Sequence, residues 1–163
     1  MFPPAATCGK HEAEKGVKDE RMLDLIEGGS TEGDSVSNGD SRLTPAEDEQ
    51  TQRLLEVIRK SIDERKGRDI VVLDLTELTP ITDYFVICSG TSSMHTRAIS
   101  ENIEICCKKA GFQHIGIEGE QNAKWILIDY CEVVVHIFLD ETRWFYNLER
   151  LWGDARRVDQ ENV

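Results

Sequence analysis

The chain is organised around one stretch: Trp125-Ile126-Leu127-Ile128-Asp129-Tyr130-Cys131-Glu132-Val133-Val134-Val135-His136-Ile137-Phe138. Two apolar, β-rich runs flank a four-residue polar break at 129–132, and this pattern predicts a β-hairpin. The runs are nearly continuous in apolar residues rather than alternating, so we expect inner strands of a sheet that helices cover. Asp129 and His136 lie within this core, where polar groups are costly to bury without partners.

The rest of the chain supplies helices and further strands around the hairpin. Helices are predicted from Thr44 to Gly67, from Ser92 or Ser93 to Gly111, and in a last region that Asp140 caps and Gly153 closes. Strands are predicted over 70–75, 84–89 and 112–118. The order α-β-β-α-β-β-β-α predicts an α/β (α+β) fold with a mixed β-sheet flanked by helices.

Composition divides the 163 residues into three parts. Residues 1–43 are rich in Gly, Ser and charged side chains, with too few apolar residues for a core, so we predict a disordered acidic N-terminal arm. Residues 44–155 carry the apolar periodicity and form the predicted folded domain. Residues 156–163 are predicted to be a polar tail.

Charge and apolar content restrict the class of protein. The net charge of −12 favours a basic partner and argues against a phosphate-binding surface spread over the whole molecule. The sequence also lacks the basic-aromatic stripe typical of proteins that bind nucleic acid sequence-specifically. No run approaches the roughly 18 apolar residues that a membrane span needs. The five cysteines contain no CxxC pair, which is typical of reduced, buried thiols. We therefore expect a cytoplasmic protein.

Two stretches invite a catalytic interpretation. The turn Ser89-Gly90-Thr91-Ser92-Ser93 precedes a helix, as a phosphate cradle would, but it lacks the phosphate-loop motifs and is typical of a turn with a helix cap. The following strand offers only Glu118 rather than paired metal-binding carboxylates. His136 with Asp129 resembles a general base and its orienting group, although a hydrogen-bonded core histidine is the favoured interpretation. The sequence predicts no catalytic residue, cofactor or metal; a cryptic nucleotidyltransferase-like, nucleotide-binding enzyme is the alternative.

Aromatic side chains are dense near the C-terminus. The residues are Trp125, Trp144, Phe145, Tyr146 and Trp152. Aromatic residues beside charged ones such as Arg143 and Glu149 are typical of interface hot spots, but aromatics serve equally well in cores. The sequence leaves both interpretations open.

Four blocks in order resemble the ribosomal silencing factor family (RsfS, Iojap). They are 82–93 (TDYFVICSGTSS), 118–120 with 125–129 (EGE, WILID), 133–138 (VVVHIF), and Arg143-x-x-Tyr146-x-Leu148-Glu149-x-Leu151-Trp152. The resemblance covers about residues 47–155. Two positions depart from the family pattern: Met94 replaces a basic residue, and Cys131-Glu132 replaces Gly followed by Asp in the hairpin turn.

The resemblance implies a fold similar to nucleotidyltransferases without their catalytic carboxylates, and a function that is not enzymatic. It implies binding to the large ribosomal subunit at its intersubunit face, through large-subunit ribosomal protein number fourteen. Such binding blocks subunit joining and represses translation. The implied partner-binding residues are Trp125, Asp129, Arg143, Tyr146, Glu149 and Trp152. Trp125 begins its strand at a sheet end, where we expect one ring face to stay open. The sequence leaves open whether the free protein is a monomer or a homodimer.

Overall fold

A computed structural model describes residues 45–158 of the chain. The predicted arm at 1–43, the predicted cap Thr44 and the last residues of the predicted tail, 159–163, lie outside the described residues.

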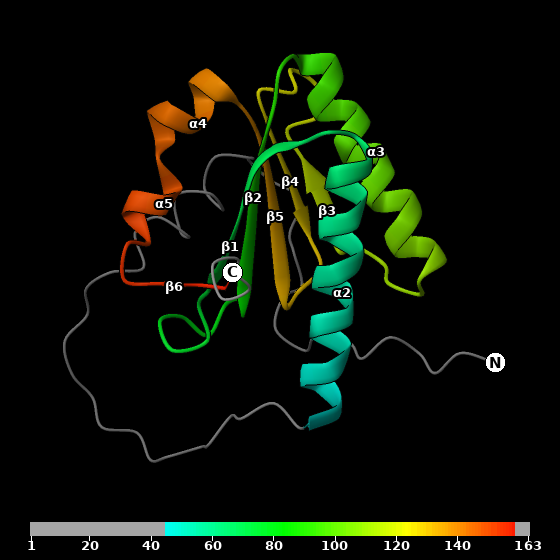
Figure 1. Cartoon of the computed structure of the whole chain (residues 1–163), viewed down its shortest axis with the longest axis vertical. Coiled ribbons are helices and arrows are strands. Elements are labelled where there is room, and N and C mark those ends of the chain that lie inside the picture. Colours follow the sequence, from blue (N-terminus) through cyan, green and yellow to red (C-terminus); the bar gives the residue numbers. More distant parts are fainter. Residues whose placement is uncertain (1–44, 159–163) are drawn as a thin grey trace. The chain divides into compact units, whose positions relative to one another are not determined.

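Six strands form one mixed sheet in the order β3-β4-β5-β2-β1-β6 (Figure 1). The strands are β1 (Arg68–Asp74), β2 (Tyr84–Gly90), β3 (Gly116–Glu118), β4 (Trp125–Asp129), β5 (Val133–Leu139) and β6 (Arg156–Arg157). β2 and β5 run parallel, and every other neighbouring pair is antiparallel. The predicted hairpin is confirmed as β4 and β5, and both strands are internal to the sheet.

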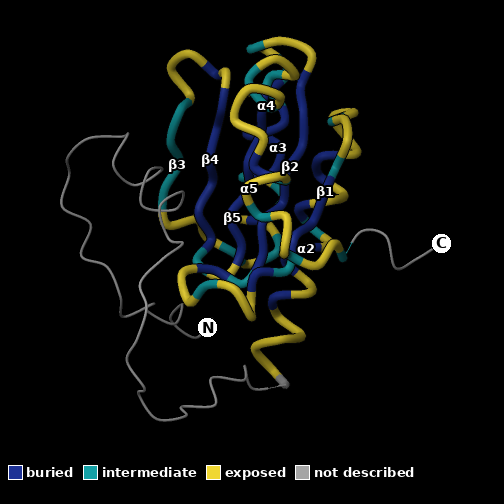
Figure 2. Tube along the Cα trace, turned by 90° about the vertical axis from the view of Figure 1, so that its left-hand side faces the viewer, coloured by how far each residue is buried: buried dark blue, intermediate teal, exposed yellow. Residues whose placement is uncertain are grey.

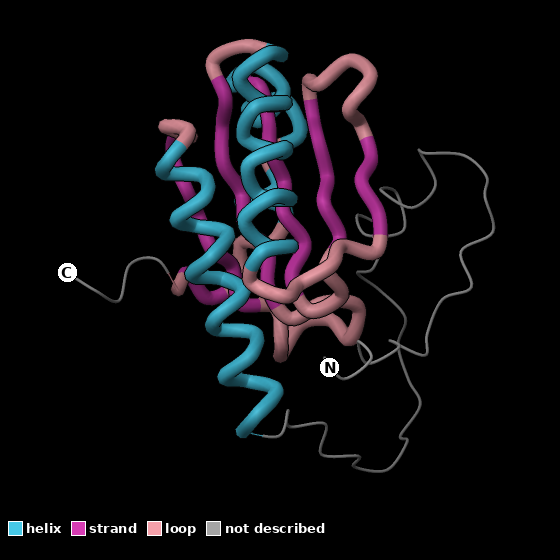
Figure 3. Tube along the Cα trace, turned by 90° about the vertical axis from the view of Figure 1, so that its right-hand side faces the viewer, coloured by secondary structure: helices cyan, strands magenta, loops and turns pink. Residues whose placement is uncertain are grey.

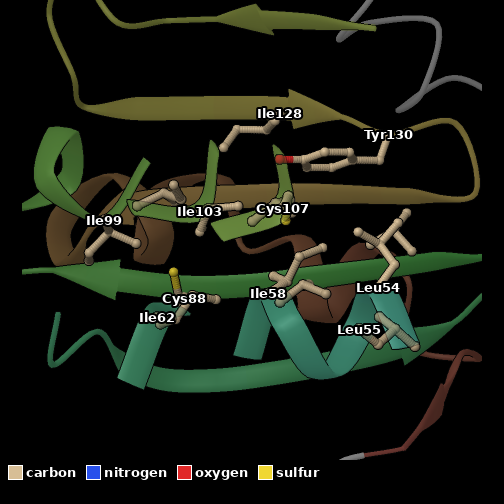
Figure 4. Close-up of a cluster of buried hydrophobic side chains, with 14 of the residues drawn as sticks. Leu54, Leu55, Ile58, Ile62, Cys88, Ile99, Ile103, Cys107, Ile128 and Tyr130 are labelled. Carbon is tan, nitrogen blue, oxygen red and sulfur yellow. The ribbon is translucent and has the colours of Figure 1, made fainter. Parts of the chain in front are cut away.

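Helices α2 (Pro45–Glu64) and α3 (Ser93–Lys109) cover one face of the sheet (Figure 3). Ser92 caps α3 by accepting a hydrogen bond from the backbone N–H of His95 at 3.1 Å, and Gly111, with φ +94°, follows its end. The apolar side of each helix packs on alternate strand residues (Figure 4). The core residues drawn from these helices are Leu54, Leu55, Ile58, Ile62, Ile99, Ile103 and Cys107.

The opposite face of the sheet carries α4 (Asp140–Tyr146) and α5 (Leu148–Leu151), which lie over its centre (Figure 2). Strand alternation turns Trp125, His136 and Phe85 towards this face, away from the α2–α3 core. Both faces of β4 and β5 are therefore buried, as the continuous apolar runs predict.

The β4–β5 turn holds a non-glycine residue in a left-handed conformation. Cys131 has φ +75°, and the N–H of Glu132 bonds the carbonyl of Tyr130 at 3.1 Å across it. The carboxylate of Asp129 accepts a hydrogen bond from the Cys131 N–H at 2.9 Å. The turn thus adopts the conformation that favours glycine, although cysteine occupies the position.

The main differences from the sequence expectation concern the third strand, the last helical region and the tail. The strand predicted over 112–118 pairs only at Gly116–Glu118, because Phe112 still bonds back to Cys107 at the end of α3. The last helical region is two helices, because Asn147 adopts φ +45° between them. Residues 156–157 of the predicted polar tail form β6 on the edge of the sheet, where they pair with β1.

Candidate partner-binding surface

A chain of aromatic rings links α4 to the interior of the sheet. Trp125 lies between Phe138 of β5, at 4.8 Å between ring centroids, and Tyr146 of α4, at 4.7 Å. Its indole N–H donates a hydrogen bond to Nδ1 of His136 at 3.1 Å. Trp125 is only 9% exposed, so the expected open ring face is wrong. Tyr146, 21 residues further along the chain, covers the ring.

His136 is a neutral structural histidine. Its Nδ1 accepts from Trp125, which places the ring proton on Nε2, and burial lowers the pKa of the imidazole to about 3. The ring also packs edge-on with Phe85, at 4.6 Å between centroids. Trp125 therefore occupies Nδ1, one of the two ring nitrogens through which an orienting group such as Asp129 would act. The hydrogen-bonded core histidine is the interpretation that these contacts support.

Arg143 fastens α4 to α5 and to the sheet. Its Nε and Nη2 donate to one carboxylate oxygen of Glu149, at 2.9 and 2.6 Å, and both side chains are largely buried. Its Nη1 donates to the backbone carbonyl of Asp69 at 2.8 Å and to the hydroxyl of Ser89 at 3.0 Å. The structure thus brings the predicted residues Arg143 and Glu149 together, with the guanidinium directed inward.

The Asp69 carbonyl reaches Arg143 through a bulge in β1. The pairing of β1 with β2 shifts between Arg68 and Val71, and Asp69 adopts φ +49° there. Such bulges redirect backbone groups at the cost of local strain. The strained residue supplies one of the three partners that hold the guanidinium.

The aromatic residues left open by the sequence divide into two groups. Trp125 is inside, and Trp152 packs edge-on against Phe85 at 5.6 Å. Trp144 and Phe145 point outward, with 83% and 75% of their surfaces exposed, and no residue of α4 is buried. The predicted site omitted these two residues. A signal was available, because consecutive helical residues point about 100° apart and three aromatics in a row cannot all face the sheet.

The turn at Gly90 has a packing role. A side chain on Gly90 would meet Thr96 of α3, with a Cβ only 2.8 Å from the Thr96 methyl group. The Thr91 N–H donates to Nδ1 of His95 at 3.0 Å, and Ser92 caps the helix. Glycine and the hydroxyl residues therefore serve the close approach and capping of α3, as the turn interpretation predicts.

The described residues offer no metal cluster. Across 45–158, no group of three or more His, Cys, Asp or Glu side chains is placed to hold an ion. Burial raises the pKa of the Cys88 thiol to about 12 and that of Cys107 to about 11, which opposes formation of a nucleophilic thiolate.

Within residues 45–158, no helix combines the length and the apolar character needed to cross a membrane.

Known proteins resemble this chain in sequence and in fold. Residues 48–163 match the family model described as ribosomal silencing factor during starvation. A ribosomal silencing factor of Halalkalibacterium halodurans is 38% identical over 112 residues, which cover 69% of this chain and 96% of that protein. A mouse protein named mitochondrial assembly of ribosomal large subunit protein 1 is 32% identical over 121 residues, covering 70% of this chain and 52% of the relative. A crystal structure of a Chromobacterium violaceum protein superposes with a TM-score of 0.62 at 31% identity, covering 63% of this chain and 85% of that one.

The chain belongs to the ribosomal silencing factor family. Membership confirms the resemblance carried by the four sequence blocks and the mixed α/β fold that it implied. The protein is therefore a ribosome-associated regulator of translation. The family is named for the silencing of ribosomes and not for an enzymatic reaction.

Proposed function

We propose that this protein acts in the cytoplasm without catalysis. It binds the large ribosomal subunit at its intersubunit face, through large-subunit ribosomal protein number fourteen. A protein seated there excludes the small subunit, so translation is repressed by steric exclusion. Family membership supports the ribosomal target, and the name of the mouse relative refers to the large subunit in particular.

The surface formed by α4 and α5 over the end of β4 carries this proposal. It contains five of the six predicted partner-binding residues: Trp125, Arg143, Tyr146, Glu149 and Trp152. Asp129 lies at the other end of β4, beside the hairpin turn. Tyr146 is 46% exposed, whereas Trp125, against which it packs, is 9% exposed. The side chains of the Arg143–Glu149 pair are also largely buried. In this proposal Tyr146 contacts the partner, and the buried residues hold α4 in place.

Charge supports the choice of partner. The protein carries a net charge of −12, and association with a basic protein is steered by such opposite charge. Steering of this kind weakens with salt, because exposed charges are screened over about 10 Å at 0.1 M ionic strength.

Co-sedimentation with purified ribosomal subunits tests the proposal. We expect the protein to pellet with large subunits and to remain in the supernatant with small subunits. Pelleting with neither, or equally with both, would contradict the proposed target. A homodimer of the free protein is part of the same proposal, and light scattering after size-exclusion chromatography measures it directly.

A further inference from the structure

The exposed side of α4 joins aromatic and acidic residues in one patch. Glu141 lies three positions before Trp144 and four before Phe145, and Asp140 lies four positions before Trp144; both acidic residues are exposed. Residues at this spacing share a helix face. We call Asp140, Glu141, Trp144 and Phe145 the α4 patch.

Exposure of this size is unusual for neighbouring aromatic residues. Single exposed apolar residues need no explanation, and the described chain has several on other elements, such as Ile105 of α3 at 49%. Trp144, Phe145 and Tyr146 are instead consecutive in the chain and all three are exposed, and the rings of Phe145 and Tyr146 pack edge-on. Contiguous apolar surface of this kind marks an interaction site.

The patch is held in one position by the contacts beneath it. Phe145 packs edge-on against Tyr146 at 5.1 Å between centroids, and Tyr146 packs against Trp125 at 4.7 Å. Arg143, immediately before Trp144, is bound to Glu149, Asp69 and Ser89. A surface that is already ordered loses less entropy on binding, which favours affinity.

The same contacts determine the charge of the patch. The only basic side chain of α4, Arg143, is turned inward and paired with Glu149. The exposed charges of α4 are therefore Asp140 and Glu141, both negative. Aromatic rings beside two carboxylates fit a protein surface that offers an apolar socket with Lys or Arg at its rim.

We propose that the α4 patch is the anchor of the ribosomal interface, with Trp144 and Phe145 entering an apolar socket of a basic ribosomal protein. Asp140 and Glu141 pair with cations at the rim of that socket. This inference rests on the proposed function, and it assigns the main contact to two residues outside the predicted set.

Binding of single variants to isolated large subunits tests the anchor. Trp144→Ala should weaken co-sedimentation about thirtyfold, the effect of losing an interface hot spot, and Phe145→Ala should weaken it about tenfold. Asp140→Asn with Glu141→Gln should weaken binding at low salt and flatten its salt dependence. Ile105→Ala, an exposed apolar residue on the other side of the sheet, is the matched control and should bind as the parent does. Because all these residues are exposed, the melting temperature of each variant should stay close to that of the parent.

The outcomes separate this inference from the proposed function. If the parent protein does not pellet with large subunits, the proposed function fails and the anchor fails with it. If the parent pellets and Trp144→Ala and Phe145→Ala both match Ile105→Ala, only the anchor is overturned. If the two aromatic variants bind normally but turn a dimer into a monomer, the patch joins two copies of this chain and the inference is equally overturned.

Discussion

The indole N–H of Trp125 donates a hydrogen bond to Nδ1 of His136, at 3.1 Å, on neighbouring strands beneath α4. Both residues are buried, so neither polar group has ready access to water. The bond satisfies Nδ1 of His136, whereas the buried Nε2 has no hydrogen-bond partner among the described residues. The bond also supports the indole ring against which Tyr146 packs.

A double-mutant cycle measures this bond. Trp125→Phe leaves the imidazole acceptor without its donor, and His136→Phe leaves the indole donor without its acceptor, so each should cost about 1–3 kcal/mol of unfolding free energy. The double variant should cost less than the sum of the two, because it removes both polar groups together. Urea unfolding supplies the three values. Strict additivity would mean that the two groups contribute independently.

His136 also predicts how stability depends on pH. Burial lowers its pKa to about 3, whereas in an unfolded chain it is near 6.5. Between these values the unfolded chain takes up a proton that the native protein does not, so stability is full above about pH 6.5 and falls as the pH approaches 3. Between pH 7 and pH 5 the parent should lose about 2 kcal/mol more than His136→Phe does. Equal losses in urea titrations at the two pH values would show that His136 does not titrate in this way.

Arg143 should control the order of α4 and α5. Arg143→Met keeps much of the apolar stem but leaves Glu149, Ser89 and the Asp69 carbonyl without the guanidinium, at a cost of about 2–3 kcal/mol. In Arg143→Met, amide hydrogen exchange in α4 and α5 should be faster than in the parent protein, whereas exchange in the α2–α3 core should change less. Arg150→Met, an exposed arginine on α5, serves as the control and should change neither quantity. Unchanged exchange in Arg143→Met would mean that other contacts hold these helices.

The hairpin turn offers a stabilising substitution. Cys131 has φ +75°, a conformation that glycine adopts without the steric cost of a Cβ. Cys131→Gly should therefore stabilise the protein by about 1 kcal/mol, whereas Cys131→Ala keeps the Cβ and should give no such gain. Thermal and urea unfolding of the two variants compare them directly. If glycine and alanine behave alike, the turn is not strained at this residue.

The sequence predicted those parts of the fold that rest on local patterns. The near-continuous apolar runs predicted the inner hairpin, and Ser92 and Gly111 predicted the limits of α3. β6 was missed because Arg156 and Arg157 carry no apolar pattern, and their place is set by backbone pairing with β1. The division of the last helix was missed although asparagine, the residue at 147, often adopts a left-handed conformation at the end of a helix.

The site was predicted less well because its arrangement depends on contacts between distant residues. Trp125 looks like an open ring at a sheet end until Tyr146 is placed over it. Arg143 looks like a surface charge until the bulge at Asp69 and the hydroxyl of Ser89 are brought beside it. Helical geometry indicates that the aromatic residues 144–146 cannot all face the sheet, and the structure shows that Trp144 and Phe145 are the ones that point outward.

Subunit joining is the most direct test of the central claim that this protein represses translation by steric exclusion. Purified large subunits are incubated with the protein, small subunits are then added, and the fraction of joined ribosomes is measured by sucrose-gradient sedimentation. We predict that the fraction of joined ribosomes falls as more protein is added before the small subunits. Ile105→Ala should inhibit joining as well as the parent does. Joining that proceeds unchanged while the protein remains bound to large subunits would contradict the account.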